Sequence, residues 1–143
     1  MLAYMCGRLC CDGTSVVSHL KVQSEEIARG ILYQNRPFVE WTDVEAVRAR
    51  LMSYFPNPNR IDGALAPSVA YLKQMTRIRN AIAHTSKPSR DGFDKLVQSL
   101  YGGKVSFPRA SKLLTAPHIH DRNKTFFDVY VTVLEIAAGS ITG

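Results

Sequence analysis

Proline, glycine and asparagine residues divide this 143-residue chain into segments whose apolar residues recur at helical spacing. The clearest breaks are Arg36-Pro37, Pro56-Asn57-Pro58-Asn59, Pro88 and Gly102-Gly103. Proline removes a backbone donor and disfavours helix at the residue before it, so separate helices are expected between the breaks. No stretch clearly alternates apolar and polar residues as a half-buried strand does. The sequence therefore predicts an all-α fold, an up-down bundle of four to five helices.

The pattern also predicts where each helix lies. The expected helices cover 1–35 (with a weak point at Asp12-Gly13-Thr14), 42–54, 67–85, 92–101 and 123–138. Thr42 followed by Glu45 predicts a capping box at the second helix. Segment 104–122 has no clear periodicity. The last helix is apolar nearly all round, which places it in the core or at a subunit interface.

Length and composition indicate one globular domain, residues 1–143. Apolar residues make up 45% of the chain, enough for a core, yet no apolar run approaches the roughly 20 residues of a membrane span. The first eleven residues lack the pattern of a signal peptide, so a cytoplasmic protein is expected. The chain begins inside an apparently helical stretch, which leaves open that it is part of a longer protein.

All three cysteines, Cys6, Cys10 and Cys11, lie within the first eleven residues. An odd number crowded at one end is not a disulfide framework, and it favours a reducing compartment. Cys6 and Cys10 are spaced to share a helical face, so a metal or redox pair is the alternative to simple packing.

Positive charge is concentrated in the middle of the chain. The formal net charge is +6, and no acidic residue lies between Lys73 and Arg90. The basic residues of this stretch are Lys73, Arg77, Arg79, Lys87 and Arg90. The cluster predicts a polyanionic partner.

The expected helix 67–85 has two faces on a helical wheel. Leu72, Met75, Ile78 and Ile82 form an apolar stripe. Arg79 falls within this stripe, where a guanidinium must be paired or face a wet cleft. A second face holds Lys73, Arg77, Asn80 and His84 within about 60°. A solvated basic face with a capping histidine is the alternative interpretation, but such a face needs no arginine on its apolar side.

The six residues Arg79-Asn80-Ala81-Ile82-Ala83-His84 resemble the Arg-x4-6-His signature of HEPN ribonuclease domains, in particular the prokaryotic RNxIAH group that includes RiboL-PSP-HEPN-like proteins. The resemblance implies a homodimer of helical bundles whose motifs meet across a twofold axis. It also implies metal-independent RNA cleavage, as in toxins and antiphage effectors, with an antitoxin or sensor protein as a further partner. Thr85, Ser86 and Lys87 follow the histidine, where many HEPN toxins have a tyrosine, so a tyrosine-modifying antitoxin is not expected.

The residue types suit this chemistry. Cleavage through the 2′-hydroxyl needs a base, an acid and cationic donors for the phosphorane, with no cofactor. His84 could act as the base or the acid, and the Arg79 guanidinium could donate hydrogen bonds to phosphate oxygens. Asn80 could orient either the histidine ring or the phosphate. One chain supplies one such histidine, so a dimer would complete the pair. Lys73, Arg77, Lys87 and Arg90 are the expected RNA-binding residues.

Three alternatives stay open from sequence. The chain could be a catalytically silent HEPN module used for dimerisation or RNA binding. It could also be an unrelated basic helical DNA-binding or adaptor protein, although no helix-turn-helix is evident. His118-Ile119-His120-Asp121 is either a loop feature or a metal site, because alternating histidines in an extended stretch point to one side.

Overall fold

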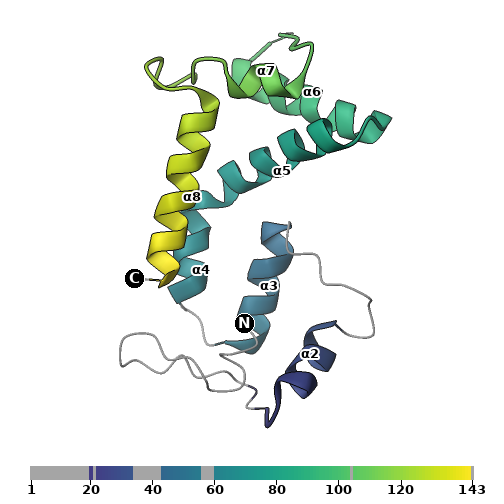
Figure 1. Cartoon of the computed structure of the whole chain (residues 1–143), viewed down its shortest axis with the longest axis vertical. Helices are drawn as coiled ribbons and strands as arrows, with labels where there is room; N and C mark the ends of the chain where they lie inside the picture. Colours follow the sequence, from purple (N-terminus) through teal and green to yellow (C-terminus); the bar gives the residue numbers. More distant parts are fainter. Residues whose placement is uncertain (1–19, 21, 34–42, 56–59, 104, 143) are drawn as a thin grey trace. The chain divides into compact units, whose positions relative to one another are not determined.

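The computed structural model describes residues 20, 22–33, 43–55, 60–103 and 105–142, and all regular elements among them are helical (Figure 1). The predicted all-α class is therefore confirmed for these residues. An isolated bridge pairs Pro117 with Thr125. None of the described helices is long and apolar enough to span a membrane. Cys6, Cys10, Cys11 and most of the first expected helix lie outside the described residues.

The chain divides into two compact units, residues 1–67 and 68–143, and each is described by itself. Whether they form the single domain expected from length stays a prediction. The helices of the first unit are α2 (Glu25–Tyr33), α3 (Val44–Tyr54) and α4 (Arg60–Leu65). The short 3-10 turn η1 (Ala66–Ser68) follows. The second unit holds α5 (Val69–Ala83), α6 (Lys87–Tyr101), α7 (Ala110–Leu114) and α8 (Phe126–Thr142).

The described residues of the first unit form a small apolar core and include a bidentate ion pair between α3 and α4. One buried cluster consists of Ala28, Leu32, Leu51 and Phe55. The Arg48 guanidinium donates to both carboxylate oxygens of Asp62, at 2.6 and 3.2 Å, and so ties α3 to α4. Asp43, and not the expected Thr42, caps α3, because its side chain accepts from the Glu45 and Ala46 backbone N–H groups. Thr42 itself lies outside the described residues.

The second unit is built around α5, which contacts α6, α7 and α8. Its core joins residues from all four helices: Ile78, Phe93, Leu96, Val97, Ala110, Leu113, Phe126 and Tyr130. Helix α6 ends at Gly102 in the left-handed conformation (φ 65°), which glycine adopts without steric cost. The expected end at Gly102-Gly103 is therefore confirmed.

Three helix starts differ from the sequence prediction. Within the expected helix 1–35, residues 22–24 are not helical, and α2 begins at Glu25. Helix α6 begins at Lys87 and not at Gly92, because Pro88 occupies the first turn, where its missing N–H is not needed. Helix α8 begins at Phe126 and not at Asn123. The Asp128 carboxylate accepts from the Thr125 backbone N–H and hydroxyl at 2.8 and 2.7 Å, which fixes that start. The short helices α4 and α7 were not predicted.

The apolar stripe predicted for α5 is only partly buried. Ile78 is buried, and Leu72 and Met75 are half-buried, but Ile82 is 57% exposed. Helix α8 is divided in the same way. Phe126 and Tyr130 are buried, whereas other apolar residues of the helix, Phe127, Leu134 and Ile136, are exposed. The second unit therefore carries an apolar surface as well as a core.

His118 belongs to the core of the second unit. It is 5% exposed, and its ring meets Phe126 edge-on at 4.8 Å between centroids. Its Nδ1 accepts the His120 backbone N–H at 3.3 Å, which requires that nitrogen to be unprotonated. Within the described residues no three His, Cys, Asp or Glu side chains gather as metal ligands do. The loop interpretation of His118-Ile119-His120-Asp121 accounts for these contacts.

We expect the free energy of unfolding to fall as the pH drops below about 6.5. Burial lowers the pKa of His118 from its usual 6.5, the nearby His120 lowers it further, and Asp121 partly opposes the shift. The unfolded chain therefore takes up a proton that the folded chain resists, so acid favours unfolding. Urea denaturation at pH 7.5 and 5.5 measures the loss. His118→Phe should reduce it, and the exposed His84→Gln should not; an unchanged loss in His118→Phe would contradict this assignment.

We expect Tyr130→Phe to cost about 1 kcal/mol of unfolding free energy, because it removes one buried hydrogen bond. The Tyr130 hydroxyl donates to Gln74 Oε1 at 3.0 Å, joining α8 to α5, and burial raises its pKa so that it stays a donor. Tyr71, whose ring packs edge-on against Tyr130, has no hydroxyl bond to a described residue and gives the control Tyr71→Phe. Equal losses in urea denaturation would argue against the bond.

Candidate functional site

The turn between α5 and α6 presents His84. Helix α5 ends at Ala83, and His84 caps it in an extended conformation (φ −129°, ψ 132°). Its backbone N–H donates to the Asn80 carbonyl at 2.9 Å, so the residue is anchored through its main chain. His84, Thr85 and Ser86 are all exposed. The backbone of His84 is therefore held at a fixed point of the hairpin, and its exposed side chain is accessible to a substrate.

A cavity of about 620 Å³ lies beside His84. Its walls come from the end of α5, the first half of α6 and the segment 107–111 that leads into α7. The charged side chains lining it are Arg90, Asp94 and Arg109, and the aromatic ones are Phe93 and Phe107. The cavity thus brings together a histidine, two arginines, one aspartate and apolar surface, and arginines beside apolar surface suit a phosphorylated ligand.

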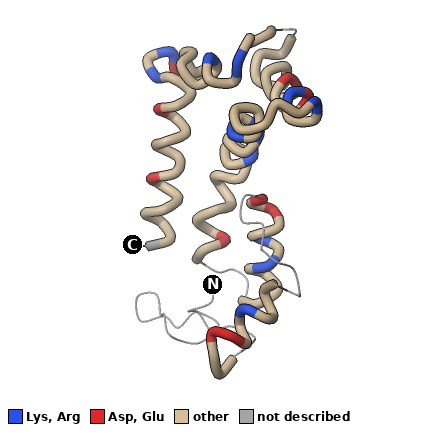
Figure 2. Tube along the Cα trace, turned by 45° about the vertical axis from the view of Figure 1, so that its right-hand side comes forward, with Lys and Arg blue, Asp and Glu red and all other residues tan. Residues whose placement is uncertain are grey.

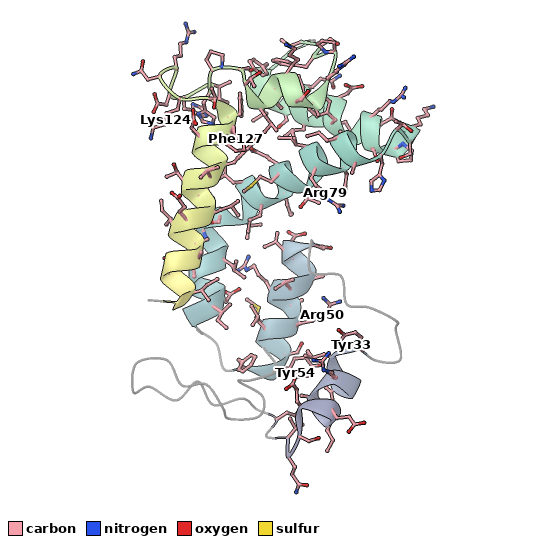
Figure 3. All side chains as sticks on the ribbon, in the orientation of Figure 1. Tyr33, Arg50, Tyr54, Arg79, Lys124 and Phe127 are labelled. Carbon is pink, nitrogen blue, oxygen red and sulfur yellow. The ribbon has the colours of Figure 1, made fainter. Side chains whose placement is uncertain are left out.

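Arg79 borders a second depression, between α5 and α8, which only apolar atoms line. This apolar groove measures about 310 Å³, and Met75, Phe127 and Leu134 help to line it (Figure 3, where Arg79 and Phe127 are labelled). Arg79 is exposed, and its Nη1 donates to the Asn80 side-chain oxygen at 3.0 Å. Ile82 lines both the groove and the cavity. Within one chain the motif is therefore divided between two depressions.

Asn80 connects the two halves of the motif. Its side-chain oxygen holds the Arg79 guanidinium, and its carbonyl holds the His84 backbone N–H. The structure gives no contact between its amide and the His84 ring. Asn80 thus orients the arginine directly and the histidine only through the helix end.

The other predicted RNA-binding residues are spread along the hairpin. Arg90 lines the cavity with His84. Lys87 is exposed at the start of α6, Arg77 is exposed on α5, and Lys73 is half-buried one turn earlier. Figure 2 places lysine and arginine on α5, α6 and the lead-in to α7, whereas the acidic Asp128 and Glu135 are the charged residues of α8. Among the four predicted RNA-binding residues, only Arg90 lines the cavity that His84 lines.

Sequence reasoning missed Arg109, Asp94 and Phe107. Arg109 and Phe107 fall in the segment 104–122, which has no periodicity from which to orient a side chain. A usable signal was the break at Pro108, two residues before Ala110, because Ala110, Leu113 and Leu114 have the spacing of one turn of a buried helix. Such a turn would have placed Arg109 at a helix start, although not beside His84.

Comparison of the chain with protein-family models, with curated proteins and with solved structures gives no match. The functional interpretation therefore depends on the motif and on the geometry around it.

Proposed function

We propose that this chain is a metal-independent endoribonuclease of HEPN type that acts as a homodimer. The observation that carries the proposal is the position of His84, which is exposed at the end of α5 and lines one cavity with Arg90 and Arg109. An accessible imidazole beside guanidinium groups is what phosphodiester cleavage without a metal requires. The role proposed from the motif is that of a toxin or antiphage effector, with an antitoxin or sensor protein as a further partner.

The proposed reaction uses the 2′-hydroxyl of the RNA as nucleophile. A base takes the 2′-hydroxyl proton while the 2′-oxygen attacks the adjacent phosphorus. The bond from phosphorus to the 5′-oxygen breaks, and an acid gives that oxygen a proton. The products are a 2′,3′-cyclic phosphate and a free 5′-hydroxyl, so atoms and charges balance. His84 serves as base or acid, and arginine donors stabilise the phosphorane.

A second copy of the chain supplies the missing acid or base. The motif contains one histidine, and Arg79 borders the α5–α8 groove through apolar atoms and does not line the His84 cavity. Ile82 and Phe127, which line that groove, are 57% and 56% exposed. An exposed apolar groove that contains a motif residue suits an interface between copies, because pairing would bury the apolar surface and bring two motifs together.

We expect His84→Ala to lower RNA cleavage at least about 100-fold, because it removes a proton-transfer group. The substrate is a short single-stranded RNA, and the 2′,3′-cyclic phosphate ends are detected by mass spectrometry. His120→Ala, which changes another exposed histidine, is the control and should cleave normally. EDTA should have no effect on the wild-type rate.

Each contrary result has a separate meaning. Undiminished cleavage by His84→Ala would refute the proposed site, and loss of activity in EDTA would refute the metal-independent mechanism. A purified wild-type dimer that binds RNA but never cleaves it would favour the catalytically silent module.

We expect Phe127→Glu to convert a wild-type dimer into a monomer and to reduce cleavage in parallel, because a carboxylate in the apolar groove opposes pairing. Sedimentation velocity measures the mass. Ile136→Glu is the matched control, since Ile136 is 63% exposed on the same helix but does not line the groove. A wild-type monomer with full activity would contradict the composite site.

A further inference from the structure

We propose that the cavity beside His84 holds one nucleotide of a single-stranded RNA, with a phosphate between Arg90 and Arg109. This inference rests on the proposed function, since it names the substrate of that site. It adds Arg109, which lies outside the motif, as a substrate-binding residue. Three observations carry it: the two guanidiniums, the apolar walls and the carboxylate that shares the cavity.

The two guanidiniums are available for a ligand. Arg90 and Arg109 are exposed, and neither forms an ion pair with a described residue. Arg48, by contrast, is held by Asp62. Two arginines that line one cavity, without an ion-pair partner among the described residues, provide planar donors that match phosphate oxygens.

The core holds both arginines at the cavity. Arg90 lies on α6 one turn before Asp94, and Phe93, which is 5% exposed, anchors this part of the helix in the core. Arg109 directly precedes Ala110, which is 7% exposed and belongs to the same core. Their backbones are thus fixed by buried neighbours from two different segments, and less ordering is required when a ligand binds.

An aromatic and an acidic residue of the cavity could contact the base and the ribose of the nucleotide. Phe107 lines the cavity and is supported from behind by Tyr101, at 5.6 Å between ring centroids. Its ring gives an apolar wall for a base or a ribose. Asp94 can accept hydrogen bonds from base amino groups or ribose hydroxyls, while its charge directs the phosphate to the arginines.

The cavity is large enough to admit an unstacked nucleotide. A volume of about 620 Å³ is within the usual range for ligand sites, and a base can enter it only when it is not paired. Single-stranded RNA meets this condition, whereas a regular duplex offers its phosphates and keeps its bases stacked. The cavity therefore selects a single strand.

Binding of a short 2′-fluoro RNA tests the inference without cleavage, because this RNA lacks the nucleophilic hydroxyl. Fluorescence anisotropy on the full chain compares wild type with Arg109→Ala, Arg109→Lys and Phe107→Ala. We expect Arg109→Ala to weaken binding about tenfold or more and to lower the salt dependence by about one counterion, with partial recovery in Arg109→Lys. Phe107→Ala should weaken binding with an unchanged salt dependence.

Arg122→Ala is the matched control, since Arg122 is an exposed arginine of the same unit that lines neither depression. It should bind within about twofold of wild type. Thermal melting by circular dichroism verifies that each variant is folded, and Arg109→Lys keeps the test valid if Arg109→Ala does not fold.

The inference and the proposed function fail in different ways. Equal binding by Arg109→Ala and wild type would overturn the inference even if the protein cleaves RNA. Loss of binding in Arg109→Ala, with no cleavage by wild type, would support the inference and refute the ribonuclease. Duplex RNA or a free mononucleotide that binds as tightly as the single strand would overturn the assigned substrate.

Discussion

The packing of α5 against α6 is the interaction on which the rest of the second unit depends. Ile78 from α5 meets Phe93 and Leu96 from α6 in one buried cluster, and this fixes the hairpin whose turn carries His84. The same cluster includes Ala110, so the segment that carries Arg109 is placed by the same core. A core of ordinary apolar residues thereby determines which polar groups share a cavity. The residues that line the cavity are positioned by buried residues that lie next to them or within about one helical turn along the chain.

This dependence explains why the motif does not form a complete site in one chain. Arg79 lies within α5, whereas His84 follows the end of the helix with an extended backbone. Arg79 borders the apolar α5–α8 groove, and His84 lines the cavity bordered by α6. Ile82, at the boundary, is exposed because neither neighbouring helix covers it. A split motif with apolar surface between its halves is the arrangement that a site shared between two chains would need.

The sequence was most informative where strong local signals bound a long helix. Helix α5 was predicted within two residues at both ends, because a proline precedes it and a histidine turn with Pro88 follows it. The start of α6 was misplaced, since Pro88 can end one helix or begin the next, and tertiary packing decides between the two. Helices α4 and α7, of six and five residues, are too short for periodicity to identify. The position of Arg109 beside His84 depends on contacts between residues far apart in the chain, which no local pattern encodes.

Whether RNA contacts the exposed end of the α5–α6 hairpin is the central question, and nuclear magnetic resonance of the histidine rings answers it most directly. The chain has four histidines, so their ring signals can be assigned by single substitutions. Titration with the non-cleavable 2′-fluoro single strand should shift the His84 ring signals, because the proposed site for the phosphate, between Arg90 and Arg109, is in the same cavity. The buried His118 and the exposed His120 should change little. RNA binding that shifts His120 while His84 stays unchanged would contradict the account.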